Sequence, residues 1–259
     1  MNRKLIILTL LFISISASLF AQNARFITEG SIVFDRSINM YGLLDKRMAK
    51  NDNGFKAQII EGFKKSQPQF KILKSTLYFA KNKTFFKPAE DNSPPIPMFG
   101  QTPEFSQINT IFSDLTTHDQ VTQKSAFEDV FLIKDKTRKI KWKITTETRE
   151  IAGYSCRRAN AIILDSIYVV AFYTEQIPVS GGPESFGGLP GMILGVALPH
   201  ENVTWFAKSV NDKTIDSKII TPPAKGKATD IKGLEAILIP ALKNYWGNDS
   251  NSILKVFML

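Results

Sequence analysis

Short apolar segments alternate with polar turns along most of the chain, which is the pattern of antiparallel β-structure. These segments recur at hairpin spacing over 70–87 and 110–174, and again over 192–210. Apolar residues at helical spacing predict helices over 55–65 and from Ile231 onward. Asp230 can cap the second helix, in which Leu234, Ile237, Leu238 and Leu242 share a face, and Pro240 should kink or shorten it. A sheet of this size tends to curl. The pattern therefore predicts a mainly antiparallel β (α+β) fold: a curved sheet or open half-barrel of about nine or ten strands with two or three covering helices.

The clearest alternation lies in 139–146, where apolar and lysine side chains exchange places at every step. Ile140, Trp142 and Ile144 would face the core while the intervening lysines stay in water, so a half-buried strand is predicted. The same basic run could bind polyanions around Trp142, but a solvated strand face accounts for it. Residues 252–259 are expected to form a last strand or a docked tail.

The most unusual stretch is 177–198, where glycine and proline are dense and an apolar run follows. Pro190 and Gly191 suit the two central positions of a type II turn. Residues 192–198 carry no polar side chain and are bounded by turns, which predicts a strand buried on both faces. Gly195 inside it indicates a bulge or a close backbone approach. The stretch is either a rigid structural crossing or a loop that lines a ligand cleft.

This stretch also carries a family resemblance. Gly188-Leu189-Pro190-Gly191-Met192-Ile193 resembles the signature of the GLPGLI family, small envelope proteins of Bacteroidetes-type bacteria. The residues 151–159 resemble that family's I-x-G-Y-x-C-x-x-A pattern, and the likeness is dense over about 151–198 only. Met192 stands where leucine is usual and Phe172 where tryptophan is common, both tolerable apolar exchanges. The family has no established activity, so the resemblance implies an envelope location and a fold, but no reaction.

Residues 1–21 look like a cleavable signal peptide, with Arg3 and Lys4 before an apolar core and small residues before Gln22. The remaining 22–259 are expected to form a single β-rich domain without a transmembrane span, exported to the periplasm or outer cell envelope. The net charge of +9 points to anionic surfaces rather than to nucleic acid in that compartment.

Two further features leave alternatives open. The five prolines within 88–107 exclude a central strand, so this loop is either flexible or a lid over one end of the sheet. Cys156 is the single cysteine, which rules out a disulfide within the chain. We expect it to be a small buried hydrophobe, with a reactive thiol or a disulfide-linked dimer as the alternatives.

No catalytic constellation, metal-ligand spacing or cofactor motif is recognisable. His118 and His200 are the only histidines and lack a ligand-type spacing. Residues 183–187 fall one glycine short of G-x-S-x-G and lack the strand–turn–helix context of a nucleophile elbow. We therefore predict neither catalytic residues nor a metal or cofactor.

The first hypothesis is a non-enzymatic envelope protein that binds an apolar or amphipathic ligand, such as a lipid or peptide, or a partner protein. Its site would be lined by the most apolar residues of the central stretch, with two neighbouring aromatic residues in a secondary role: Phe186, Leu189, Met192, Tyr173 and Trp205. The alternatives are a structural or interaction protein without a cavity, and a hydrolase that uses carboxylates within 165–184, namely Asp165, Glu175 or Glu184.

Overall fold

The computed structural model describes residues 26–49, 55–94, 96, 104–106, 108–216 and 218–259. The predicted signal peptide, residues 1–21, lies outside them, as does much of the Pro-rich loop at 97–103. The described strands form one 12-stranded sheet in the order β12-β6-β5-β4-β3-β2-β1-β11-β10-β9-β8-β7. Neighbours are antiparallel apart from β12 and β6, which pair in parallel. The antiparallel fold class is thus confirmed.

The elements of the described chain follow one another in this order: β1 (Gly30–Asn39), α2 (Met40–Met48), α3 (Lys56–Ser66), β2 (Phe70–Ala80), β3 (Lys83–Pro88), β4 (Asn109–Asp114), β5 (Asp119–Ala126), β6 (Asp129–Lys136), β7 (Lys143–Ile151), β8 (Tyr154–Ile163), β9 (Ile167–Thr174), β10 (Met192–Leu198), β11 (Val203–Asn211), β12 (Lys227–Thr229), α4 (Ile231–Trp246) and α5 (Ser250–Phe257).

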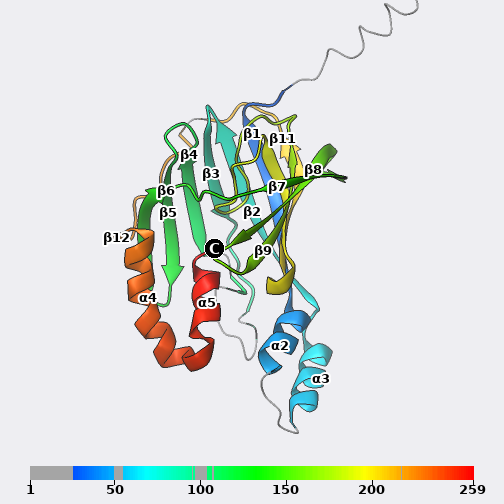
Figure 1. The fold of residues 1–259 in the computed structure, drawn as a ribbon, viewed down its shortest axis with the longest axis vertical. Helices are drawn as coiled ribbons and strands as arrows, with labels where there is room; N and C mark the ends of the chain where they lie inside the picture. The colour runs from blue at the N-terminus through cyan, green and yellow to red at the C-terminus, as the bar shows by residue number, and fades with distance from the viewer. Residues whose placement is uncertain (1–25, 50–54, 95, 97–103, 107, 217) are drawn as a thin grey trace, which may run out of the picture.

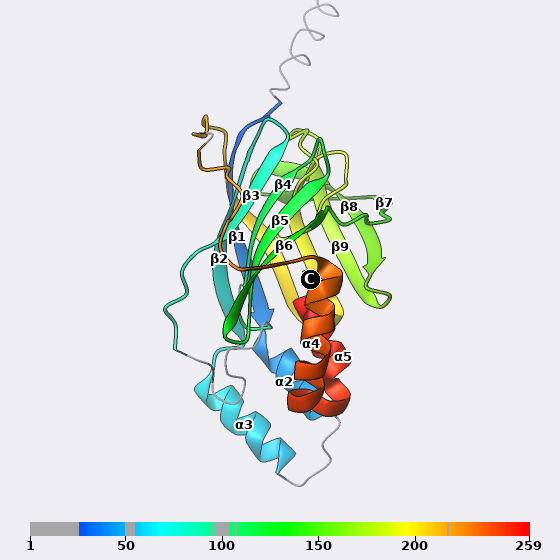
Figure 2. The same cartoon turned by 90° about the vertical axis from the view of Figure 1, so that its left-hand side faces the viewer.

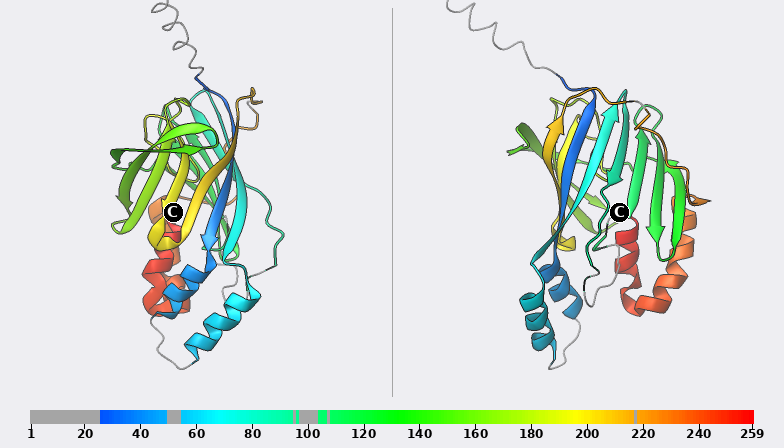
Figure 3. Two further views of the ribbon diagram at one scale, coloured as in Figure 1. Left: turned by 90° about the vertical axis from the view of Figure 1, so that its right-hand side faces the viewer. Right: turned by 180° about the vertical axis from the view of Figure 1, so that it is seen from behind.

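The sheet is open, because its terminal strands β12 and β7 pair with no partner beyond their single neighbours. It curls so that its two ends turn toward each other around a concave side, which we call the hollow (Figure 1). Helices α4 and α5 lie beside the β5–β6 end, while α2 and α3 extend beyond one end of the strands (Figures 2 and 3). The last residue, marked C in these views, sits within the hollow.

The counts of nine or ten strands and two or three helices were too low. The short β12 (Lys227–Thr229) was not predicted, because three residues are too few to show an alternation. Helix α2 has a mixed polar composition, yet Asn39 caps it by accepting from the Gly42 N–H at 3.2 Å. Residues 250–257 form the helix α5 instead of a strand.

The predicted burial of residues 192–198 is confirmed. Every residue of β10 is buried apart from Ala197, which is half-buried. The register with β9 shifts between Ile193 and Gly195, as a bulge requires. A Cβ atom at Gly195 would lie 2.6 Å from Cε1 of Phe206, so this position needs glycine for space.

The type II turn predicted at Pro190-Gly191 is wrong. Gly191 does not adopt the positive φ that such a turn requires, and the left-handed residue is Gly188, at φ +86°. Gly191 is needed for a different reason: a Cβ atom there would lie 2.1 Å from the Thr174 carbonyl oxygen. The glycine therefore lets the loop pass close to the end of β9.

The predicted strand at 139–146 is half wrong. Strand β6 ends at Lys136 and β7 begins at Lys143, so residues 137–142 cross from one end of the sheet to the opposite edge (Figure 1). We call this segment the strap. Ile140 and Trp142 do pack against the core, but Ile144 is 40% exposed on the edge strand. The alternation therefore arises from a segment that spans the hollow with Ile140 and Trp142 turned toward the core.

Helix α4 begins as expected, since the Asp230 carboxylate accepts from the Gly233 N–H at 2.7 Å. Leu234, Leu238 and Leu242 are fully buried against α5 and β6. Ile237, which the helical spacing placed on the same face, is 48% exposed. Pro240 does not shorten the helix, which continues to Trp246.

Candidate functional site

A cavity with a volume of about 620 Å³ lies in the hollow of the sheet, against the strap. We call it the groove. Strands β4, β5 and β6 form one wall, and the end of β8 with the start of α4 forms another. This volume is in the range of small-molecule sites. Its lining combines a cationic set, Lys124, Lys136, Arg138, Lys139 and Lys141, with an apolar set, Ile111, Ile133, Ile162, Ile163, Leu164, Ile231, Met258 and Leu259.

The cations of the groove outnumber its acids. Three carboxylates line it, Asp135, Asp165 and Glu235. Lys136 is neutralised by Asp119 at 2.7 Å. Among the described residues the other four cations, Lys124, Arg138, Lys139 and Lys141, form no ion pair within 4 Å. The groove therefore presents unneutralised positive charge beside an apolar wall.

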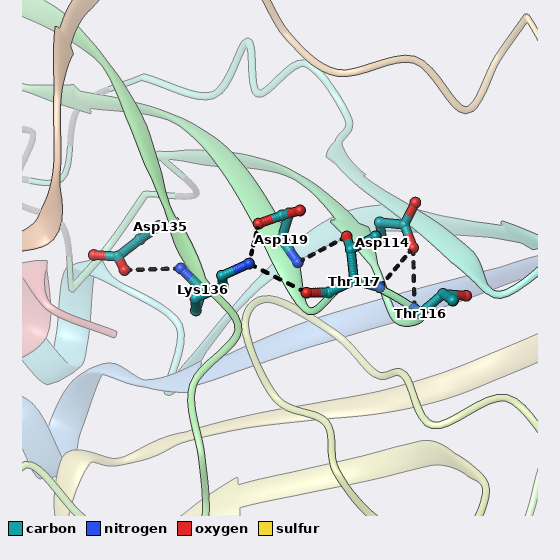
Figure 4. A network of polar contacts seen from close by, with 6 residues as sticks. All are labelled: Asp114, Thr116, Thr117, Asp119, Asp135 and Lys136. Carbon is teal, nitrogen blue, oxygen red and sulfur yellow. Dashed lines mark hydrogen bonds and ion pairs between the residues drawn. The ribbon is translucent and has the colours of Figure 1, made fainter.

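A polar network fixes the first end of the strap (Figure 4). Asp114 accepts from the N–H groups of Thr116 and Thr117 and so closes the turn between β4 and β5. Lys136 bridges this turn, because its ammonium group donates to Asp119 at 2.7 Å and to the Thr117 carbonyl at 3.3 Å. The next residue along, Thr137, donates its N–H to the His118 carbonyl at 2.8 Å.

The second end of the strap is held by Trp142, whose indole N–H donates to the Gly187 carbonyl at 2.9 Å. Gly187 belongs to the β9–β10 loop, residues 175–191, so the strap joins the β5–β6 end of the sheet to this loop. Between the two anchors Arg138, Lys139 and Lys141 of the strap line the groove. Lys139 and Lys141 are exposed to solvent, as the alternation predicted, but they also border a cavity.

A buried charge cluster lies beneath the β9–β10 loop. Glu184 adopts the left-handed conformation at φ +52° and its carboxylate accepts from the Asn109 side-chain amide at 2.8 Å. Burial raises the pKa of Glu184, although Arg36 and Lys124 nearby oppose the shift. Burial also lowers the pKa of Arg36 to about 10 and that of Lys124 to about 8. A buried non-glycine residue with positive φ is costly, and such residues cluster at functional sites.

Two smaller cavities adjoin the groove. One, of about 100 Å³, lies against residues 180–188 of the loop and shares Gln120, Arg138 and Ser185 with the groove. The other, of about 20 Å³, lies against Glu184, Phe186 and Trp205, and shares Asn109 and Leu259 with the groove. The three cavities thus meet around a few residues at the inner end of the loop.

The last three residues, 257–259, which we call the tail, contact the same polar groups. Lys124 donates to the Phe257 carbonyl at 2.6 Å, and Arg138 donates to the Met258 carbonyl. The hydroxyl of Ser185 donates to the Leu259 carbonyl at 3.0 Å. The tail is therefore docked in the hollow, in agreement with one of the two expectations for 252–259.

The residues predicted to bind a ligand are all core residues, each at most 3% exposed: Phe186, Leu189, Met192, Tyr173 and Trp205. Phe186 and Trp205 contact each other with ring centroids 6.0 Å apart and line the 20 Å³ cavity. Leu189, Met192 and Tyr173 line none of the three cavities described above. Of the motif Gly188, Leu189, Pro190, Gly191, only Gly188 lines one of these cavities, the one of about 100 Å³, and it directly follows Gly187, which accepts from Trp142.

The sequence patterns did not single out the two buried cations, Lys124 and Arg36. Lys124 sits in β5 and is only 4% exposed, and Arg36 sits in β1 at 5%. Both occupy inward positions of strands whose neighbours two residues away are apolar or small, such as Phe34 and Ala126. A charged residue in phase with the core side of a strand was the available signal, since burying a charge is expensive.

Other chemistry finds little support in the described residues. Within them no three histidine, cysteine, aspartate or glutamate side chains are grouped as a metal ion would require. Cys156 is fully buried, and burial raises the pKa of its thiol to about 12, which makes it unreactive at neutral pH. Among the described helices, none has the length and apolar character needed to cross a bilayer.

Comparison with known proteins adds a partial family match and a fold. Comparison with curated proteins gives no match. Two solved structures, titled "Structure of PNGF-II in C2 space group" and "Structure of PNGF-II in P21 space group", superpose with TM-scores of 0.51 and 0.50 at 14% identity. They cover 81% of this chain, which spans 32% and 33% of theirs, and at that identity the likeness concerns the fold alone. Residues 163–195 match the family described as "Protein of unknown function (Porph_ging)", and so include the Gly188–Gly191 motif.

Proposed function

We propose that this protein is a non-enzymatic, exported envelope protein that binds an amphipathic anion in the groove. The single observation that carries the proposal is the composition of the groove, in which four cations without an ion pair face an apolar wall. A carboxylate or phosphate head would neutralise the cations, and an alkyl chain would cover the apolar wall. The sequence hypothesis allowed an apolar ligand, an amphipathic ligand or a partner protein. The groove favours an amphipathic ligand with a negative charge.

The apolar wall favours a ligand with a hydrocarbon part. Ile162 at the end of β8 is 65% exposed and Ile231 at the start of α4 is 36% exposed, and both line the groove. Large exposed apolar side chains that gather at a cavity are typical of binding sites. Burying both would contribute about 1–3 kcal/mol to binding.

The envelope location rests on the sequence. The signal-peptide pattern of residues 1–21 and the GLPGLI resemblance over 151–198 support export, and we propose membership of that family on the same residues. Amphipathic anions, such as fatty acids and phospholipids, are the material of an envelope. The net charge of +9, which becomes +7 when Arg3 and Lys4 leave with the signal peptide, would favour their approach to the protein.

Calorimetric titration of the full chain with dodecanoate, below its micelle-forming concentration, tests the proposal. Dodecyl maltoside and dodecyltrimethylammonium serve as neutral and cationic probes with the same alkyl chain. We expect dodecanoate to bind at least about tenfold more tightly than either, because only it neutralises the groove. Equal binding of the three probes, or no binding of dodecanoate, would contradict the proposal.

Two variants locate the site. Replacing Lys139 and Lys141 together by methionine keeps the length of both side chains and removes two charges from the groove. We expect dodecanoate affinity to fall about 3- to 10-fold. Lys208→Met is the matched control, because Lys208 is an exposed lysine of β11 that does not line the groove.

A further inference from the structure

The tail occupies the polar end of the groove. Three consecutive main-chain oxygens, of Phe257, Met258 and Leu259, accept hydrogen bonds from Lys124, Arg138 and Ser185. The donors come from three separate parts of the fold, namely β5, the strap and the β9–β10 loop. Because all three also line the groove, the tail engages the groups that an anionic head would need.

The tail satisfies these donors only in part. Lys124 and Arg138 contact the peptide carbonyls of Phe257 and Met258, whose oxygens carry only a partial charge, whereas a buried ammonium or guanidinium group is best compensated by a full negative charge. Burial lowers the pKa of Lys124 to about 8 and also lowers that of Arg138, so both cations are held at a cost. Glu184 is the carboxylate that acts on Lys124, and burial raises its pKa. An incoming anion would improve the compensation of both cations.

The tail also divides the hollow. Leu259 lines both the groove and the 20 Å³ cavity that contains Glu184 and Trp205, so it forms part of the wall between them. Its N–H donates to Val256 at 3.3 Å and the Met258 N–H donates to Leu254 at 2.9 Å, both within the last turn of α5. Moving the tail would require the end of α5 to unwind and the buried side chains of Phe257 and Met258 to leave the cluster around α4, and it would enlarge the groove.

We propose that residues 257–259 are an intramolecular occupant of the head-group subsite formed by the two cations Lys124 and Arg138, that the Ser185 hydroxyl helps to hold them there, and that an amphipathic anion binds by displacing them. This inference rests on the proposed function and adds its regulation. Occupant and ligand compete for the same donors, so the apparent affinity is reduced by the fraction of molecules in which the tail is docked. A change that loosens the tail without removing a cation should therefore tighten ligand binding.

Ser185→Ala provides this separation, because it removes one hydrogen bond to the tail and leaves every groove cation in place. We expect dodecanoate to bind about 2- to 10-fold more tightly to this variant than to the natural chain. Lys124→Met should bind dodecanoate more weakly, since the cation contacts the ligand as well as the tail. Ser113→Ala is the control, because the Ser113 hydroxyl accepts from Gln120 and does not contact the tail.

Hydrogen exchange of the full chain gives an independent readout. Saturating dodecanoate should accelerate exchange of the Met258 and Leu259 amides at least about tenfold while those of β10 stay protected. If dodecanoate binds but these amides are unaffected, or if Ser185→Ala binds it no more tightly, the displacement is wrong and the proposed function stands. If dodecanoate binds neither the natural chain nor Ser185→Ala, the proposed function itself fails.

Discussion

The indole N–H of Trp142 donates to the carbonyl of Gly187 at 2.9 Å and thereby ties the strap to the β9–β10 loop. The two residues are 45 positions apart in the sequence. The strap leaves β6 near one end of the sheet and enters β7 at the other, so this bond helps to hold the open sheet in its curled form. It also sets where Lys139 and Lys141 stand in the groove.

Trp142→Phe should destabilise the fold by about 1–2 kcal/mol, because the Gly187 carbonyl loses its donor and some packing is lost with it. The midpoint of urea unfolding measures this change. Trp246→Phe is the matched control, since the Trp246 indole packs against Phe127 and Tyr245 and forms no hydrogen bond to the described residues. Equal losses in the two variants would mean that the hydrogen bond contributes nothing.

Gly191→Ala should cost about 2–3 kcal/mol or more, because its Cβ atom would stand 2.1 Å from the Thr174 carbonyl oxygen, which belongs to the backbone and cannot swing aside. Gly62→Ala is the opposite case: Gly62 lies inside α3 with nothing within 4 Å of the added methyl group. That variant should be more stable by about 0.5–1 kcal/mol. Thermal unfolding measures the stability of both variants. A loss in Gly191→Ala alone would show that crowding is the cause, and a loss in both would show that alanine is poorly tolerated in general.

Local patterns predicted the elements whose environment is local. The alternation and turns of 70–87 gave β2 and β3 with the correct hairpin, and the apolar run of 192–198 gave the doubly buried β10. Asp230 marked the start of α4 because a capping side chain acts within three residues. The Gly188–Gly191 motif lies in the loop that accepts the hydrogen bond of Trp142.

The strap and the groove could not be predicted in the same way. Whether 137–142 belongs to a sheet or crosses a hollow depends on where β6 and β7 lie in the strand order, and that order brings together residues far apart in sequence. The same holds for Lys124 and Phe257, which are 133 positions apart. The predicted ligand-binding residues were the most apolar ones of the loop, and they proved to be core residues. In the sequence, an apolar side chain of the core looks the same as one that lines a ligand site.

Dodecanoate binding should weaken as the pH rises through about 8. Burial lowers the pKa of Lys124 from 10.5 to about 8, so the ammonium form is fully present below that pH and is lost above it. Dodecanoate stays ionised throughout, so its affinity should fall about tenfold between pH 7 and pH 9. In Lys124→Met the affinity should be lower at pH 7 and change little over the same range. A pH dependence that is unaltered in this variant would assign the titration to another group.

Glu184→Gln should be tolerated at neutral pH, contrary to the expectation for a buried partner of two cations. The pKa of Glu184 is raised above 4.5 by burial, so the folded state prefers the protonated, neutral side chain more than the unfolded state does. The natural chain therefore binds more protons when folded, and its stability falls as the pH rises from about 4.5 through the folded-state pKa.

Glutamine imitates the neutral form and can still accept from Asn109, which now donates to Glu184 at 2.8 Å. The stability of the variant should therefore not fall with pH in this way. Urea titrations over pH 4–8 should show its free energy of unfolding rising relative to that of the natural chain as the pH increases. At pH 7 its free energy of unfolding should lie within about 1 kcal/mol of the natural value or above it. A loss of about 3 kcal/mol at pH 7 would instead show that the ionised carboxylate holds Arg36 and Lys124 in place, and that burial is outweighed by their attraction.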